Sequence, residues 1–372
     1  MGYLFRSFRT SLGSGLGGLS RLAGRLVVAG GRRAFPEAPY MSRFETRAPW
    51  CIVVADAAGP TRRVPGQSRS NGVPIQYCGL GEPTTMLQKA LHRALRLSAA
   101  ARVLATAAEV HRMHWQGALW CVRPEHRFVS EYPGWSALTT ASAVLWIAAR
   151  APTALVTILP ARCYVADEWT LAVALHRALY ERPLAVDDVV TLGISTTESV
   201  IDEDSLTLCA SVGRPTGTVP VSRSEPGSSS TEGSAQRGAL IASGIYIGYA
   251  GTFAMQFYKY WPTLTHELLR QLAGPLDRGG ERRVPPSLAR EALLAAPRQY
   301  WDRPPWVPRQ VVGVNPCGWS GLRSTRAIER IACPKRGRYA NPQDMPAFRR
   351  EKRASEPDQC AFEHEANSTM QF

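Results

Sequence analysis

The sequence predicts an α/β domain, and three observations indicate this class. From Trp50 onward, short apolar runs alternate with stretches of helical period, which is the pattern of strands and helices in α/β proteins. The chain has 372 residues and is 45% hydrophobic, so it can bury a large core. Polar segments without periodicity bound the patterned region. We therefore expect one domain over residues 48–335.

The first elements follow each other in the expected order. WCIVVA, residues 50–55, predicts the first strand. Apolar residues then recur at i, i+4 and i+5 from Met86 to Leu95, behind Thr84 and Thr85, which predicts a capped amphipathic helix. RVLATAA, starting at Arg102, predicts the second strand.

The alternation continues to the end of the domain. Strands are expected at 128–130, 154–160, 188–194, 239–250 and 309–314, and helices at 138–149, from Asp167, at 252–272 and at 288–296. Parallel strands joined by helical crossovers place an active site at their carboxyl ends. The loops after Ala55, Leu159 and Ile194 are therefore the first candidates for a site.

Three segments are expected to stand outside the core. Residues 1–47 are rich in Arg, Ser and Gly and predict a disordered basic arm, although a transit peptide or an over-extended start has the same composition. Residues 224–238 predict a low-complexity loop, and residues 336–372 a flexible polar tail.

Charge and cysteine usage narrow the function classes. The net charge is +14, but the arginines are scattered and no basic run is interleaved with aromatic residues, which argues against a nucleic-acid groove. No apolar run is long enough for a bilayer, so no membrane contact is expected. The eight cysteines are spaced singly without a CxxC motif, which favours reduced thiols in a cytoplasmic protein and no cysteine metal site.

Five motifs, taken in order and with their spacing, carry a family resemblance. They are VVADAAGPTRR, VPIQYC, TILPARCYVADE, GALIASGIYI and CGWSGL. From about Trp50 to Ile331 the chain resembles the sugar-1-phosphate nucleotidyltransferases, most closely the mannose-1-phosphate guanylyltransferase branch. The resemblance implies a Rossmann-like, three-layer fold of glycosyltransferase A type with a mixed, mainly parallel sheet. It also implies a reaction in which GTP and mannose 1-phosphate give GDP-mannose and pyrophosphate with the help of Mg²⁺.

The same resemblance assigns candidate site residues. Arg62 is the candidate catalytic residue, because a guanidinium can hold the β- and γ-phosphates through a bidentate contact. A plain surface loop with two arginines remains the alternative for this segment. The nucleotide is expected at Ala58, Gly59, Thr61, Arg62, Gln76 and Ser136, and the sugar phosphate at Ser243, Gly244, Trp319 and Ser320.

Several polar positions of the family pattern are replaced in this chain. Ile75 stands where the family has a lysine that neutralises phosphate charge, and no lysine precedes Lys89. Arg162 and Gly321 stand where the family has the two carboxylates that hold Mg²⁺. No metal ligand is therefore predicted at these positions.

Other acids could in principle supply metal ligands. Asp56, Asp167 and Glu168 are the candidates, but Asp56 is expected to be a solvated loop residue and Asp167 a helix cap. The interpretation requires Arg162 and Gly321 to lie close together in the fold.

Three functional hypotheses stay open. The chain is an impaired enzyme that still needs Mg²⁺, or an inactive protein that binds a nucleotide such as GTP, a hexose 1-phosphate or a nucleotide sugar. In the second case it could be a partner subunit of an active homologue. The third hypothesis is a decaying copy without a selected function. Apolar patterns survive while polar site positions are lost, which is expected where folding is retained and catalysis is not.

Overall fold

The computed structural model describes residues 48–57, 61–62, 72–131, 133–181, 184–195, 207–209, 222–224, 240–288, 306, 308–322, 327–328 and 331. For 61–62, 207–209 and 222–224 the backbone alone is described. The predicted arm (1–47) and tail (336–372) lie outside these residues, as does the predicted low-complexity loop apart from Ser224.

One mixed sheet organises the described residues. Its strands follow the order β11-β5-β4-β1-β6-β10-β7-β12, and β8 and β9 continue it beside β10. The strands are β1 (Trp50–Val54), β4 (Val103–Ala108), β5 (Arg127–Ser130), β6 (Leu155–Pro160), β7 (Val189–Ser195), β8 (Thr207–Cys209), β9 (Ser222–Ser224), β10 (Leu240–Tyr249), β11 (Arg282–Arg283) and β12 (Gln310–Val314). A separate two-stranded ribbon pairs β2 (Thr61–Arg62) with β3 (Val73–Pro74).

Most neighbouring strands of the main sheet are parallel. The pairs β11–β5, β5–β4, β4–β1, β1–β6 and β7–β12 are parallel, whereas β10 runs antiparallel to both β6 and β7. The carboxyl ends of β1, β4, β5, β6, β7 and β12 therefore share one edge, which we call the carboxyl edge. The amino half of β10 reaches the same edge, because Leu240 pairs with Ser195.

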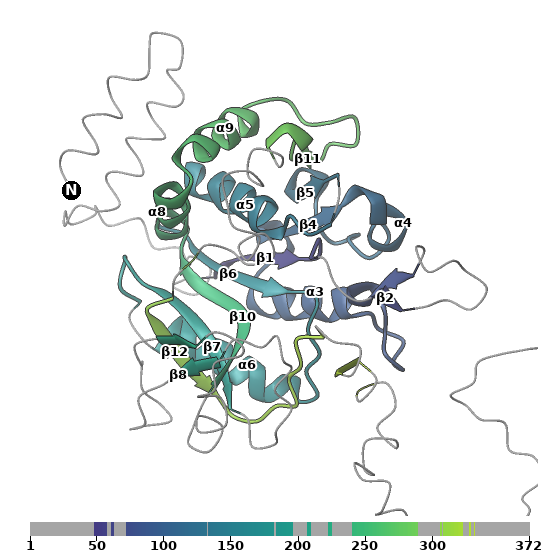
Figure 1. The fold of residues 1–372 in the computed structure, drawn as a ribbon, viewed down its shortest axis with the longest axis vertical. Coiled ribbons are helices and arrows are strands. Elements are labelled where there is room, and N and C mark those ends of the chain that lie inside the picture. The colour runs from purple at the N-terminus through teal and green to yellow at the C-terminus, as the bar shows by residue number, and fades with distance from the viewer. Residues whose placement is uncertain are drawn as a thin grey trace, which may run out of the picture.

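Helices cover both faces of the sheet and complete three layers (Figure 1). They are α3 (Met86–Leu97), α4 (Arg112–Trp115), α5 (Ser136–Arg150), α6 (Glu168–His176), α8 (Ala250–Tyr260) and α9 (Pro262–Leu272). Shorter turns of helix are η2 (Ile75–Tyr77), η3 (Ala100–Arg102), η4 (Glu109–His111), η5 (Pro124–His126) and η6 (Arg177–Glu181).

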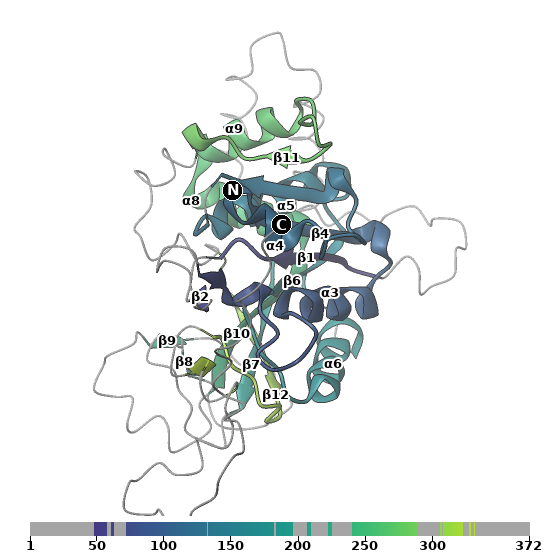
Figure 2. The ribbon, with the colours of Figure 1, turned by 90° about the vertical axis from the view of Figure 1, so that its right-hand side faces the viewer.

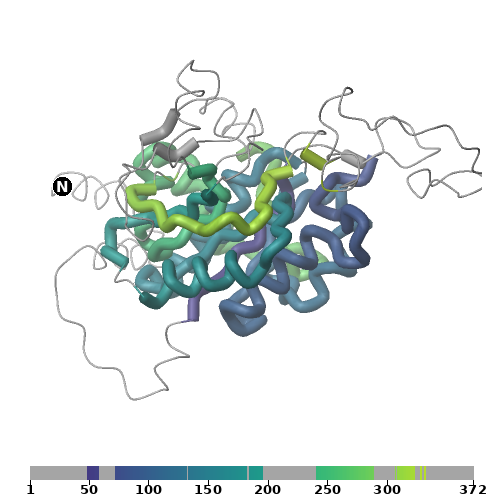
Figure 3. The backbone as a smooth tube through the Cα atoms, turned by 90° about the horizontal axis from the view of Figure 1, so that it is seen from below, coloured from purple at the N-terminus to yellow at the C-terminus, as the bar shows by residue number. Residues whose placement is uncertain are grey.

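Each face of the sheet has its own core. On one face, buried residues of α3, α4 and α6 pack against alternate strand residues such as Cys51 and Val53. On the other face, α5, α8 and α9 pack against the residues between them, such as Ile52. Figure 2 shows the helices of the two faces on either side of the sheet, and Figure 3 shows α3 and α6 side by side on the first face. The alternation follows from the period of two in strand side chains.

The capped helix after the first strand is confirmed. Thr85 is the N-cap of α3: its hydroxyl accepts from the Gln88 amide, while the Gln88 side chain accepts from the Thr85 amide. This reciprocal pair is a capping box. Asp167 is likewise the N-cap of α6, as the sequence predicted.

The prediction of one helix over 252–272 is wrong. The structure has two helices, α8 and α9, which meet at Trp261 and Pro262. Pro262 is the first residue of α9, a position that its missing amide suits, whereas inside a helix it would remove a hydrogen bond. The predicted helix at 288–296 lies outside the described residues beyond Leu288.

Within the described part of the chain, no helix is both long and apolar enough to cross a bilayer.

Candidate functional site

Asp56 follows β1 at the carboxyl edge and is completely buried. The Thr106 hydroxyl of β4 donates to its Oδ1 at 2.6 Å, and the Thr139 hydroxyl of α5 donates to its Oδ2 at 2.6 Å. Its backbone oxygen accepts from the Gly134 amide at 2.9 Å. The expectation of a solvated loop residue is wrong, because hydroxyls of two neighbouring elements replace water around this carboxyl group.

Gln76 joins η2 to the chain that leaves β1. It is 1% exposed, and its Nε2 donates to the backbone oxygens of Ala55 at 3.2 Å and Ala57 at 3.1 Å. The Tyr77 hydroxyl donates to Ala55 as well, at 2.9 Å. Burial, and then the charge of Asp56, raises the pKa of Tyr77. Gln76 Oε1 has no partner among the described residues, so it is left as an acceptor for an N–H group of a ligand.

Ser136 is the first residue of α5 and lies at the same edge. It is 2% exposed, and its hydroxyl has no partner in the described part of the chain. The N-cap residue of this helix, Trp135, makes no side-chain capping hydrogen bond. The first amides of an uncapped 15-residue helix present partial positive charge, which favours a negatively charged group. Gln76 and Ser136 thus flank the residues that lead from β1 into the predicted nucleotide loop.

The other predicted nucleotide residues are described only in part. Ala58 and Gly59 lie outside the described residues. Thr61 pairs with Pro74 and Arg62 pairs with Val73, so the backbone of β2 runs beside the start of η2. The side chains of Thr61 and Arg62 are not described, and the phosphate contact of Arg62 stays a prediction.

The segments that carry Arg162 and Gly321 lie against each other. Tyr164 and Ser320 form a bridge through two hydrogen bonds of 2.9 Å each. The bridge is antiparallel, so residues before Tyr164 lie across from residues after Ser320. Arg162 is two residues from the bridge and Gly321 one residue, on the same side of it. The backbones at Arg162 and Gly321 therefore lie close together, as the interpretation of the sequence required.

Gly318 makes this approach possible. Its φ is +62°, and a Cβ built there would lie 2.7 Å from Cβ of Ala166. The amides of Ala166 and Asp167 both donate to the Cys317 oxygen, at 3.1 Å and 3.0 Å. Any side chain at Gly318 would push the two segments apart.

The predicted sugar-phosphate residues gather around the end of β6. Ser243 and Gly244 lie in a bulge of β10 between Ala242 and Tyr246, and a Cβ on Gly244 would be 3.6 Å from Cγ of Pro160. The Ser243 hydroxyl stabilises the bulge, because it donates to Leu192 O at 2.8 Å and accepts from the Ile245 amide.

Trp319 and Ser320 lie in the segment that pairs with Tyr164, four residues after the end of β6. Trp319 Nε1 is buried without a partner among the described residues, and Ser320 makes the bridge to Tyr164. Since β1 and β6 are neighbours, with Val54 paired to Pro160, the predicted nucleotide and sugar-phosphate residues occupy adjacent parts of one edge.

The residues present do not fit a Mg²⁺ ion at the two positions where the resemblance implies carboxylates. Arg162 is a cation and Gly321 has no side chain, whereas Mg²⁺ prefers carboxylate oxygens. Within the described residues, no group of three or more His, Cys, Asp or Glu side chains could hold a metal.

The nearby acids are engaged elsewhere. Asp56 binds two threonine hydroxyls, and Asp167 accepts from the Trp169 and Thr170 amides. The Thr170 side chain, followed by these amides, keeps the pKa of Asp167 below its ordinary value. Glu168 accepts two hydrogen bonds from Arg93, at 2.8 Å and 2.6 Å.

Arg93 holds the segment around Arg162 in place, and the sequence did not predict this role. It is 5% exposed, lies on α3, and its Nη1 also donates to the Cys163 sulfur at 3.2 Å. It therefore ties α3 to α6 and to the residue that follows Arg162. A signal was present in the sequence: Arg93 follows Ala90 and precedes Ala94 on the apolar side of the helix, where a buried ion pair was to be expected.

Comparison with known proteins establishes the fold. No family model matches the chain, and no curated protein matches its sequence. Among solved structures, a protein named mannose-1-phosphate geranyltransferase from Thermus thermophilus has a TM-score of 0.54 at 20% identity, covering 76% of this chain and 78% of its own. A protein named mannose-6-phosphate isomerase from Helicobacter pylori has a TM-score of 0.52 at 15% identity, covering 73% and 98%.

The predicted fold class is confirmed. The protein has a three-layer α/β fold with a mixed, mainly parallel sheet, and shares it with these two structures.

Proposed function

We propose that this protein binds a nucleotide or nucleotide sugar at the carboxyl edge of its sheet and does not carry out metal-assisted nucleotidyl transfer. One observation carries the proposal. The bridge between Tyr164 and Ser320 holds together the two segments in which the family resemblance implies carboxylates, and these segments carry Arg162 and Gly321.

Arg162 offers positive charge where the resemblance implies a metal ion. A guanidinium binds phosphate oxygens directly and in bidentate fashion, so phosphate groups can be held there without Mg²⁺. Transfer needs more than binding, because the charge that develops on the phosphates in the transition state has to be neutralised by preorganised cations. At the family's lysine position, Ile75 is completely buried in an apolar cluster.

The nucleotide end of the site retains groups that a ligand can use. Gln76 Oε1 and the Ser136 hydroxyl are buried without partners in the described residues. Leaving two such groups unpaired costs free energy, on the order of 1–3 kcal/mol each, which a bound nucleotide can recover through hydrogen bonds. The uncapped start of α5 favours phosphate at the same place.

Retained catalysis is the competing function, and it needs other acids. Asp56, Asp167 and Glu168 would have to leave the hydrogen bonds described above before they could bind a metal. For Glu168 this would also leave the buried Arg93 unpaired, which is strongly unfavourable.

GTP and GDP-mannose are the first ligands to test, since the resemblance points to them and both solved structures are named for mannose phosphates. Isothermal titration should be performed with Mg²⁺ and with EDTA, together with an assay of pyrophosphate release. We expect the same affinity in both conditions and no pyrophosphate above the level without protein.

Two variants sharpen the test. Arg162→Ala should weaken binding at least about tenfold, as expected for loss of a charged hydrogen-bonding partner. Arg309→Ala, which removes an arginine with 68% of its side chain exposed, should leave binding unchanged. Binding that requires Mg²⁺ and is followed by pyrophosphate release contradicts the proposal. The absence of binding in both conditions contradicts it as well.

A further inference from the structure

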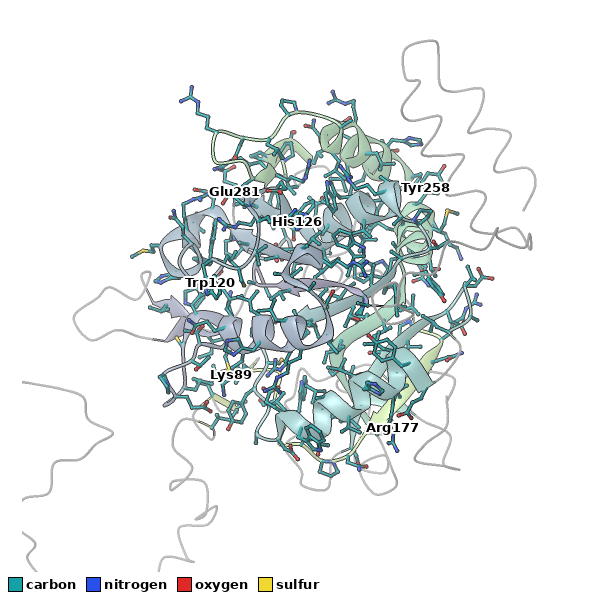
Figure 4. The ribbon with its side chains drawn as sticks, turned by 180° about the vertical axis from the view of Figure 1, so that it is seen from behind. Lys89, Trp120, His126, Arg177, Tyr258 and Glu281 are labelled. Atoms are coloured by element: carbon teal, nitrogen blue, oxygen red, sulfur yellow. The ribbon has the colours of Figure 1, made fainter. Side chains whose placement is uncertain are left out.

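A second cluster of polar groups lies at the opposite, amino edge of the sheet. Its centre is Trp146, near the end of α5, which is 6% exposed. The Trp146 ring meets His126 at 5.1 Å and Trp50 at 5.7 Å between centroids, both edge-on. In Figure 4, His126 lies in the half of the molecule that also carries Glu281 and Tyr258, away from Lys89 and Arg177.

Two arginines converge on this indole from different elements. Cζ of Arg150, the last residue of α5, is 4.0 Å from the centroid of the Trp146 ring, and Cζ of Arg282, the first residue of β11, is 5.5 Å from it. Their hydrogen bonds go to backbone oxygens: Arg150 to Trp146, and Arg282 to Glu125 and Leu272. Trp146 and Leu272 lie near helix ends, so both arginines also offset the negative ends of α5 and α9.

These contacts leave most of the guanidinium donors for another partner. Each guanidinium presents several N–H groups in one plane, and the backbone oxygens use one on Arg150 and two on Arg282. Arg150 is exposed and Arg282 half-buried, so a ligand can reach both.

The cluster has more positive than negative charge. Within the described residues neither Arg150 nor Arg282 forms a salt bridge. The two arginines act on each other's charge, and the other charged groups that act on this cluster are Arg123 and Glu125. Burial lowers the pKa of both Arg150 and Arg282, and the charge of Arg150 lowers that of Arg282 further. A nearby anion would relieve this repulsion.

Two buried polar atoms at the same place have no partner among the described residues. They are Nδ1 of His126, a residue that is 4% exposed, and Nε1 of Trp146. Because more than about 90% of buried polar groups are hydrogen-bonded in folded proteins, two orphans in one cluster indicate a missing partner. Trp146 Nε1 is a donor, which suits an oxyanion. His126 Nδ1 donates only when the ring is protonated, and burial lowers the pKa of that ring.

We infer that the amino edge of the sheet carries an oxyanion site, in which Arg150 and Arg282 bind the phosphate group of a small molecule. A tetrahedral, doubly charged phosphate has enough oxygens to reach donors on both guanidiniums, whereas a single carboxylate suits one guanidinium fork. The site lies at the opposite edge from the proposed nucleotide site and does not depend on it.

Inorganic phosphate is the probe for this site. We expect the whole protein to bind it at two places by isothermal titration, one lost in Arg162→Ala and the other in Arg150→Gln and in Arg282→Gln. Each glutamine variant should weaken amino-edge binding at least about tenfold, while Arg309→Gln, matched in charge, should retain both sites. Phosphate binding that is unchanged in both glutamine variants overturns the inference, and so does binding that disappears completely with Arg162→Ala.

Two further measurements keep the outcome interpretable. Arg150→Lys and Arg282→Lys preserve charge and support the same helix ends, so a cooperative melt with weakened phosphate binding in these variants supports the site. Unweakened binding in them overturns the role of the guanidinium forks. Acetate that competes with equal affinity overturns the assignment to phosphate.

Discussion

Asp56 shows how a single side chain can hold several elements at the carboxyl edge. Its two oxygens bind Thr106 of β4 and Thr139 of α5, while its backbone belongs to the exit of β1. The edge on which Gln76 and Ser136 lie is therefore fixed by a buried polar group as well as by apolar packing.

Asp56→Ala should destabilise the fold. The variant leaves the Thr106 hydroxyl buried without its acceptor and creates a small cavity, which together cost about 2–4 kcal/mol. The free energy of unfolding from urea titration measures this loss. Thr139→Val is the milder comparison, because the Thr139 hydroxyl also contacts backbone oxygens of its own helix. A loss below about 0.5 kcal/mol for Asp56→Ala would contradict this role.

The lowered pKa of His126 should make the stability of the fold depend on pH. Its pKa is lowered from 6.5, first by burial, with Glu125 opposing the shift and Arg123 and Arg282 adding to it. The unfolded chain therefore takes up a proton at a higher pH than the folded protein does. It follows that stability is retained above pH 6.5 and lost as the pH falls through the lower pKa of the folded state.

Urea titrations across that pH window measure the effect. The slope of unfolding free energy against pH should be smaller in His126→Phe than in the parent protein. An identical slope in both proteins would show that other groups cause the acid sensitivity.

The sequence shows which residues depart from the pattern that the resemblance implies, but not how the remaining polar residues are used. Arg162, Gly321 and Ile75 could be read directly from the motifs. The burial of Asp56 could not, because its partners lie 50 and 83 residues away and a pattern of neighbours carries no information about them.

At the scale of elements, capping side chains fix where α3 and α6 begin. Thr85→Ala should cost about 1 kcal/mol, since it removes one half of the capping box of α3. Thr84→Ala is the matched control and should change stability by less than about 0.5 kcal/mol, because Thr84 lies outside the helix. Urea titration of the two variants side by side gives the difference, and equal losses would contradict the assignment of Thr85 as the cap.

Gly318→Ala should loosen the pairing of 317–322 with 164–167. The added methyl group meets Ala166, and the positive φ is itself unfavourable for alanine, so we expect a loss of about 1–3 kcal/mol. Gly117→Ala is the control, since a Cβ there has nothing within 4 Å. Faster amide exchange at Tyr164 and Ser320 in Gly318→Ala alone would place the effect at the bridge, and unchanged exchange there would contradict it.

Periodicity located the longer strands β1, β4, β5, β6, β7, β10 and β12, and most helices, because each buries one face or stripe, but it missed the strands of two or three residues. It failed at Pro262, where the apolar period continues across two helices and only the missing amide of proline marks the break. It also gave no sign of β11, a strand of two residues, Arg282 and Arg283, with neither side chain fully buried. So short a segment cannot express a period.

At the scale of the whole molecule, alternation of strands and helices was sufficient to predict an α/β domain, and the family resemblance implied its three layers. The position of β10 between β6 and β7, and its antiparallel direction, was not predictable in this way, because a buried strand has the same apolar character in either direction. That placement brings Ser243 and Gly244 to the carboxyl edge. Which residues reach the site thus depends on the order and direction of the strands, which periodicity in a single sequence does not predict.

If the fold has been retained while the chemistry of its edge was exchanged, restoring the carboxylates should restore metal dependence. In the double variant Arg162→Asp/Gly321→Asp, two acids would lie on the same side of the antiparallel bridge between Tyr164 and Ser320. We expect GTP to bind at least about tenfold more tightly with Mg²⁺ than with EDTA, because a divalent ion then has oxygen ligands and no competing guanidinium. Pyrophosphate release should remain absent, since Ile75 still supplies no charge.

The single variants separate the contributions of the two positions. Arg162→Asp alone removes the phosphate-binding cation without completing a metal site, so it should weaken GTP binding in both conditions. Gly321→Asp alone places an acid beside Arg162, and the two should pair with each other instead of binding a metal. Titration of all three proteins with GTP, with and without Mg²⁺, tests the argument. Magnesium-independent binding by the double variant would mean that the two segments do not form a common site.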